Sequence, residues 1–300
     1  MKTYLDCIPC FFQQALRAAR IAGADDDSTK RLLDQIALTI PTIAMDRTPP
    51  EIGAIVYRQI SAITGSPDPY KELKRHNIRH AQALYPEVKE KVAASQEPLV
   101  TAVRVAIAGN VIDFGVNAAF DLEGDLERIL EQDFAVFDYD RFSRRAASAQ
   151  NILYIGDNAG EAVFDRVLIE ELARSDGNSD TSHGQGAHEQ KRVTFAVRGE
   201  PVINDITTVE ADIIGLPDVA EVVSSGSPAP GAVLSHCTDD FIRRFYEADM
   251  VISKGQGNYE ALSGVDREIF FMLKTKCSVL ARHLGVEEGG IVLKAESTGP

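Results

Sequence analysis

The sequence predicts an α/β protein with a Rossmann-like, mainly parallel sheet and helices on both faces, plus an N-terminal all-helical unit. Two patterns carry this prediction. After Asn151, short apolar runs alternate with amphipathic stretches, as in parallel strands joined by helices. Before that point, apolar residues recur every three or four positions, which is typical of helices. We therefore divide the chain into a helical domain, residues 1–148, and an α/β domain, residues 149–300.

In the helical half, apolar residues recur at helical spacing from Cys10 onward. Ser28 is positioned to cap a second helix, and Pro49 suits the first turn of a third. Because proline interrupts helices, Pro86 should separate a fourth helix from a fifth. The later helices are expected over Tyr70–Leu84, Val88–Ala94, Leu99–Ala108, Leu122–Gln132 and Tyr139–Ala147.

In the α/β half, short buried runs predict the strands. The polar, Gly/Ser-rich segment Ser175–Gln190 is expected to be a flexible excursion between a helix and a strand. The expected strands are Ile152–Ile155, Val193–Val197, Glu221–Val223, Met250–Ser253, Ile269–Leu273 and Ile291–Leu293. The expected helices are Glu161–Arg174, Thr207–Ile214, Asp239–Ala248, Tyr259–Leu262 and Cys277–Leu284.

Composition excludes some functions. A net charge of −14 argues against a nucleic-acid-binding protein, which normally shows a basic surface. No apolar run has the length of a membrane span, and the first ten residues lack the apolar core of a signal peptide. We therefore expect a cytoplasmic protein that binds neither nucleic acids nor membranes. Small acidic substrates remain compatible, because a metal ion and a few cations reverse the local field. The oligomeric state is left open.

Asp157 and Asn158 directly follow the predicted strand Ile152–Ile155. In open parallel sheets, ligands bind beyond the carboxyl ends of the strands. A carboxylate beside a carboxamide suits a hard cation such as Mg²⁺ or Mn²⁺. An Asp-Asn turn that caps a helix explains this stretch equally well when it is taken alone.

Two further segments end at the same predicted edge. Asp205 precedes a helix in which Thr207 and Glu210 have capping-box spacing, so capping explains Thr207 but not Asp205. Lys254 precedes a Gly-x-Gly loop that opens a helix, where a phosphate could meet backbone amides and an ammonium group. A solvated surface lysine is the alternative, since lysine is rarely buried.

Cys7 and Cys10 form a C-x-x-C pair near the start of the first helix. A structural zinc site needs a second pair or histidines at matching spacing, and a thioredoxin-like role needs a strand before the pair. Neither context is present. Simple apolar packing, metal binding and a redox role separate from catalysis all remain open.

Three segments together resemble a known family, the damage-control phosphatases, formerly called domain of unknown function eighty-nine. They are GDNAGE with Asp165, RGEPVINDIT and ISKGQGNYE, and the resemblance covers nearly the whole chain. The C-x-x-C pair and the GNVIDFG motif at residues 109–115 resemble the prokaryotic branch of this family. Larger eukaryotic members lack the C-x-x-C pair, so their sugar-phosphate preference is not transferred.

The resemblance implies hydrolysis of small phosphomonoesters, damaged or surplus phosphometabolites, with one divalent ion per site (Mg²⁺, Mn²⁺, Co²⁺ or Ni²⁺). It also implies a role for each matching residue. The metal ligands would be Asp157, Asn158 and Asp205, the catalytic phosphate-binding cation Lys254, and the substrate contacts Ser225, Gly226 and Asn258. Because Asp157 already acts as a ligand, we favour metal-activated water over attack by Asp157 itself.

Two functions from other classes stay open. A nucleotide- or S-adenosylmethionine-dependent transferase could use the same strand–loop–helix topology, although GDNAGE lacks the spaced glycines of a dinucleotide loop. A non-catalytic metal-binding module would bind divalent ions without turning over any phosphomonoester.

Overall fold

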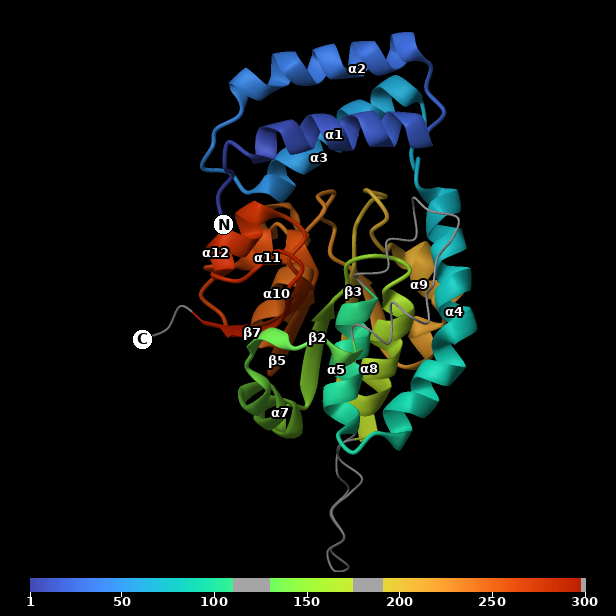
Figure 1. Cartoon of the computed structure of the whole chain (residues 1–300), viewed down its shortest axis with the longest axis vertical. Coiled ribbons are helices and arrows are strands. Elements are labelled where there is room, and N and C mark those ends of the chain that lie inside the picture. Colours follow the sequence, from blue (N-terminus) through green and yellow to red (C-terminus); the bar gives the residue numbers. More distant parts are fainter. Residues whose placement is uncertain (110–129, 175–190, 298–300) are drawn as a thin grey trace, which may run out of the picture.

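The computed structural model describes residues 1–109, 130–174 and 191–297. Its centre is a seven-stranded sheet with the order β1-β7-β6-β5-β2-β3-β4 (Figure 1). Neighbouring strands pair in parallel except β6 and β7, which are antiparallel. The mainly parallel sheet is thus confirmed. The strands are β1 (Phe134–Phe137), β2 (Asn151–Ile155), β3 (Arg192–Val197), β4 (Glu221–Ser224), β5 (Met250–Lys254), β6 (Ile269–Lys274) and β7 (Ile291–Glu296).

Both faces of the sheet are covered by helices, as predicted. Successive side chains of a strand point to opposite faces, so Tyr154 and Ile252 lie in one core while Leu153 and Val251 lie in the other. The first core is closed by α4 (Lys71–Ala94), α5 (Pro98–Ala108), α7 (Tyr139–Ser148), α8 (Ala162–Arg174) and α9 (Thr208–Ile214). The second is closed by α10 (Asp239–Glu247), α11 (Gln256–Leu262) and α12 (Ser278–Leu284).

The first three helices form a separate layer, drawn in blue at the top of Figure 1. They are α1 (Cys7–Ile21), α2 (Asp26–Thr39) and α3 (Pro49–Thr64), and they enclose their own core around Phe11, Leu32 and Ile52. The layer is attached to the sheet unit through α3, which packs against α11. It therefore lies over the loops that leave the carboxyl ends of the central strands.

Two of the expected helix signals are wrong, and α11 begins at Gln256, before the expected Tyr259. The cap of α2 is Asp25, whose carboxylate accepts a hydrogen bond from the Ser28 amide at 2.8 Å, so Ser28 is not the cap. Pro86 lies inside α4 and does not end it. Val88 and Val92 continue the buried face of this helix beyond the proline, and their packing outweighs the one backbone hydrogen bond that proline removes.

The division at residue 148 stays a prediction, and the packing partitions the chain differently. α5 belongs to the first half of the sequence, yet Val103 shares a core with Tyr154 of β2. β1 also precedes residue 148 and was not expected; it is a four-residue edge strand whose side chains alternate between half-buried and exposed. Most of the helix expected over Leu122–Gln132, and all of the excursion Ser175–Gln190, fall outside the described residues. No helix in the described ranges has the length and apolar character needed to cross a membrane.

Candidate active site

The loops that follow β2 and β3 bring three of the predicted ligands together. Asp157 and Asn158 leave β2, and Asp205 lies in the loop after β3. The two loops form a short antiparallel bridge between Asn158 and Asp205. It is reinforced by the Ile206 amide, which donates to the Asp157 carbonyl oxygen at 2.9 Å. Residues almost fifty positions apart in sequence therefore meet at one edge of the sheet.

Unusual backbone conformations lie next to both acids, Asp157 and Asp205. Gly255, after β5, has φ +80°, and a Cβ there would lie 1.9 Å from Oδ2 of Asp157. Only glycine lets β5 approach this carboxylate so closely. Ile203, two residues before Asp205, has φ 46°, a strained conformation for a β-branched residue. Strain of this kind concentrates at functional sites, where surrounding contacts enforce it.

Arg198 joins the two carboxylates, and sequence reasoning assigned it no role. Its Nε donates to Oδ2 of Asp205 at 2.7 Å, and its Nη2 lies 3.4 Å from Oδ1 of Asp157. The guanidinium is almost fully buried. Burial raises the pKa of Asp205 to about 7, and the charge of Asp157 adds to this although Arg198 opposes it. One cation thus faces two buried carboxylates, which favours the arrival of another cation.

The donor set fits a hard divalent ion. Among the described residues, no group of three or more histidine, cysteine or acidic side chains is arranged to hold a metal, so two carboxylates need an amide as the third donor. Nδ2 of Asn158 donates to Oδ2 of Asp157 at 3.0 Å. The amide oxygen, Oδ1 of Asn158, is then the atom of this side chain that is available to a cation. Two carboxylate ligands and one amide oxygen suit Mg²⁺ or Mn²⁺.

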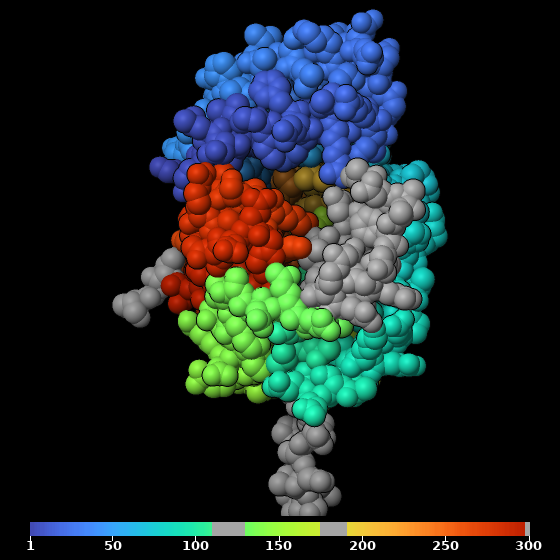
Figure 2. Space-filling view, in the orientation of Figure 1, coloured from blue at the N-terminus to red at the C-terminus, as the bar shows by residue number. Residues whose placement is uncertain are grey.

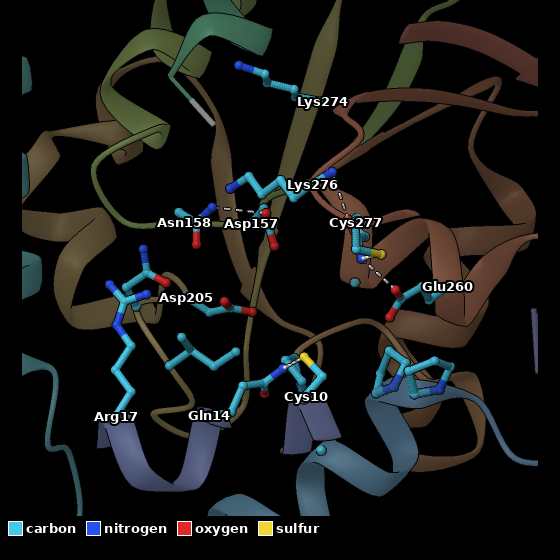
Figure 3. A pocket seen from close by; sticks show the side chains of 18 of the residues that line it. Cys10, Gln14, Arg17, Asp157, Asn158, Asp205, Glu260, Lys274, Lys276 and Cys277 are labelled. Atoms are coloured by element: carbon cyan, nitrogen blue, oxygen red, sulfur yellow. Dashed lines mark hydrogen bonds between the residues drawn. The ribbon is translucent and has the colours of Figure 1, made fainter. Parts of the chain in front are cut away.

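These three side chains line a cavity of about 730 Å³ between the helical layer and the sheet unit. The hollow is visible in Figure 2 between the blue N-terminal helices and the red C-terminal segment. Figure 3 shows side chains that reach into it from both sides. Cys10, Gln14 and Arg17 come from α1, and Lys276 follows β6. The helical layer is therefore part of the site.

The cavity wall carries charges of both signs. Arg17, Lys274 and Lys276 contribute cations, and Figure 3 shows Lys276 on the same side of the cavity as Asp157. Glu260 lines the same cavity, and burial raises its pKa to about 7, although its carboxylate accepts a hydrogen bond from Gln256 Nε2 at 2.8 Å.

Comparison with known proteins identifies the family. The family model described as the damage-control phosphatase ARMT1-like domain matches residues 3–292. The chain belongs to this family. It is 33% identical to a damage-control phosphatase from Pyrococcus horikoshii over 295 residues, which cover 97% of each chain. A damage-control phosphatase from Archaeoglobus fulgidus is 29% identical over 96% of this chain and 97% of its own length.

A solved structure agrees with the fold. The crystal structure of a DUF89 family protein from Pyrococcus horikoshii matches 98% of this chain and 99% of its own, with a TM-score of 0.87 and 32% identity. The resemblance to the damage-control phosphatase family is therefore confirmed. Assignment to the prokaryotic branch with a C-x-x-C pair stays a prediction.

In this member of the damage-control phosphatase family, Lys254 does not reach the cavity. Its side chain is fully buried and is absent from the described residues that line the cavity. Nζ contacts a carboxylate oxygen of Glu161, Oδ1 of Asp165 at 2.6 Å and the Ala106 carbonyl oxygen at 2.8 Å. An ammonium group has three N–H donors, and these acceptors use all of them. The direct phosphate contact expected for Lys254 stays a prediction, and this geometry does not provide it.

The expected substrate contacts Ser225 and Asn258 are also fully buried, and neither is among the described cavity-lining residues. Asn258 Nδ2 donates to the carbonyl oxygens of Gly156 at 3.0 Å and Lys254 at 2.7 Å, so it connects the ends of β2 and β5. Gly226 has φ +77° and packs against Thr238. A role in substrate binding stays a prediction for all three, and the observed contacts stabilise the loops around the site.

The two cysteines of the C-x-x-C pair lie in different surroundings. Cys7 begins α1, whereas Cys10 lines the cavity and accepts a hydrogen bond from Gln14 Nε2 at 3.1 Å. Both thiols are free, and burial raises the pKa of each. They are therefore poor nucleophiles at neutral pH. Beyond Gly109, the GNVIDFG motif lies outside the described residues.

Proposed function

We propose that this protein is a divalent-metal-dependent phosphatase for small phosphorylated metabolites, with Asp157, Asn158 and Asp205 as the metal ligands. The observation that carries the proposal is the position of these side chains. Two acids and an amide meet at the carboxyl edge of parallel strands and face one cavity. Relatives named damage-control phosphatases support the reaction class.

A bound divalent ion would neutralise phosphoryl oxygens and lower the pKa of a water molecule. Contacts within the protein hold the two ligand carboxylates in position for the ion. Arg198 orients the carboxylate of Asp205 through its 2.7 Å hydrogen bond, so little reorganisation is needed when the ion arrives. Gly255 leaves room for the carboxylate of Asp157. We assign no nucleophilic role to Asp157, because its carboxylate is needed for the ion.

Cations of the cavity wall would bind the negative groups of the substrate. Lys276 lies on the side of Asp157 and is the cation that we propose for the phosphoryl group (Figure 3). Arg17 and Lys274 add positive charge farther along the wall. In a chain of net charge −14, such a local group of cations attracts an anion that the rest of the surface repels. A cavity of about 730 Å³ is within the range of small-metabolite pockets.

The test is phosphate release from a panel of phosphomonoesters by metal-stripped protein, with Mg²⁺, Mn²⁺, Co²⁺ or Ni²⁺ added back. We expect turnover only with added metal, and none from an Asp157→Asn variant purified in parallel, which controls for contaminating phosphatases. Metal binding without turnover of any ester would instead identify a non-catalytic module. A nucleotide or S-adenosylmethionine found by mass spectrometry in the purified protein would favour a transferase.

A further inference from the structure

The amide of Asn158 can bind a cation only through its oxygen, so its orientation matters. Nδ2 donates to Oδ2 of Asp157 at 3.0 Å and to Oε2 of Glu161 at 3.3 Å. Rotating the amide by 180° would place its oxygen against both carboxylates. The two acceptors therefore determine which end of the amide faces the cation.

Glu161 is itself held in place. Its side chain is fully buried, and its two oxygens have different partners: Oε1 contacts Nζ of Lys254, and Oε2 accepts from Asn158. Lys254 is also anchored, by Asp165 at 2.6 Å and by the carbonyl oxygen of Ala106 at 2.8 Å. Gly109 packs closely behind, since a Cβ there would lie 3.1 Å from the Cα of Glu161. A rigid chain of contacts thus runs from Lys254 through Glu161 to Asn158.

We propose that Glu161 is a positioning residue that orients the Asn158 amide for metal binding, and that Lys254 acts through Glu161. This inference rests on the proposed role of Asn158 as a metal ligand. Groups that hydrogen-bond to metal ligands typically change metal affinity or activity by about 10- to 100-fold when they are removed. The same range is expected here, without any contact between Lys254 and the substrate.

Calorimetric titration with Mn²⁺ alone tests the proposal. Glu161→Gln offers one oxygen where the glutamate offers two, so it cannot satisfy both Lys254 and Asn158. We expect Mn²⁺ affinity to fall by about 10-fold or more in Glu161→Gln and in Lys254→Met. The double variant should bind Mn²⁺ no more weakly than the worse single variant, because both changes act through one amide. Saturating Mn²⁺ should restore much of the turnover.

Tyr154→Phe is the matched control. It removes the 2.7 Å hydrogen bond from the Tyr154 hydroxyl to Asp165, which perturbs the same buried group without touching Glu161 or Asn158. We expect a lower melting temperature and unchanged Mn²⁺ affinity. If Lys254→Met keeps wild-type Mn²⁺ affinity while KM for a phosphomonoester rises, Lys254 contacts phosphate and the inference is wrong. If the wild type binds no divalent ion, the proposed function fails and this inference fails with it.

Discussion

Two neighbouring groups of charged side chains have the same make-up and opposite surroundings. Each contains two carboxylates and one cation, and Asn158 donates a hydrogen bond to each. The cavity cluster is Asp157, Asp205 and Arg198, and the buried cluster is Glu161, Asp165 and Lys254. The acids of the first line a cavity, whereas the second is fully enclosed. Access to the cavity, more than charge or residue type, therefore separates a candidate ligand site from a supporting frame.

In the enclosed cluster, burial raises the pKa of Glu161 to about 7 and also raises that of Asp165, while the charge of Lys254 opposes both shifts. Burial alone would lower the pKa of Lys254, but the carboxylates of Asp165 and Glu161 outweigh it and raise that pKa. Removing one member would leave a buried charge without compensation, which is costly. In the cavity cluster, a divalent ion can supply the missing positive charge. The two clusters should consequently respond differently to mutation and to metal.

The largest effect is expected from Asp157→Asn. The change keeps the size of the side chain and removes the charge that attracts a cation. Turnover should fall by more than about 100-fold, because even groups that only support a metal ligand cost 10- to 100-fold. Steady-state phosphate release measures this, beside Asp212→Asn, an exposed acid on α9, as the control. Wild-type turnover at limiting metal would remove Asp157 from the site.

Gly255→Ala should have the next largest effect, because it presses on the cavity cluster from β5. Gly255 and Gly285 both have positive φ, but only a Cβ at 255 meets Asp157; the space at 285 is open. Gly285→Ala should lose about 1 kcal/mol of stability from backbone strain, and Gly255→Ala more, because φ 80° with ψ 165° is a conformation that only glycine adopts readily. Only Gly255→Ala should also lose turnover, by about 10-fold or more. Equal kinetics in the two variants would show that the position of Asp157 is not critical.

Glu260 provides a third case beside the cavity cluster and the buried cluster, since it is an acid of the cavity wall that belongs to neither. The pKa of Glu260 is raised by burial from 4.5 to about 7, so the folded protein keeps a proton that the unfolded chain releases in that range. Stability should therefore fall as pH rises through that window and level off above pH 7. The loss should be on the order of 1–3 kcal/mol.

Glu260→Gln removes this titration and keeps an oxygen that can accept the hydrogen bond from Gln256. The variant should be more stable than the wild type at pH 8 and less dependent on pH. Urea denaturation at pH 5 and pH 8 measures the difference. Parallel pH curves for the two proteins would mean that Glu260 does not titrate in this window.

Six strands of the sheet could be predicted from the sequence, because most of them are continuous apolar runs such as Ile152–Ile155. The structure confirms each of these predicted strands. The sequence was also sufficient to indicate Asp157 and Asp205, since both follow strands whose carboxyl ends meet. β1 was missed although Phe134–Phe137 is itself an apolar run, because four residues between two expected helices are too few to distinguish a strand from a helix end. The helix end predicted at Pro86 was wrong, because tertiary packing of α4 outweighs the low helix propensity of proline.

Local sequence patterns do not predict which charged side chains of different loops form ion pairs. Arg198 follows β3 and Lys254 is the last residue of β5, so both lie at the same edge of the sheet. Only the folded contacts show that Arg198 joins the cavity acids while Lys254 turns toward Glu161. The contribution of α1 to the cavity wall likewise depends on how the helical layer docks, which a periodic pattern does not reveal.

The smallest effect is expected from replacing Cys7 and Cys10 with serine. Neither thiol belongs to either cluster, and both are free. Stability should change by about 1 kcal/mol or less, with any redox sensitivity lost and the metal requirement of turnover unchanged. Melting curves in reducing and oxidising buffer, combined with metal-dependent kinetics, measure this. Loss of the catalytic metal in the double variant would show that the pair takes part in metal binding.

The central claim is that Asp157, Asn158 and Asp205 hold the ion on which hydrolysis depends. The most direct measurement is phosphate release by metal-stripped protein as Mn²⁺ is titrated back, for the wild type and Asp205→Asn side by side. We predict no release without metal, a saturable return of turnover in the wild type, and a flat baseline in Asp205→Asn. Full turnover by the stripped wild type, or the same Mn²⁺ dependence in both proteins, would contradict the account.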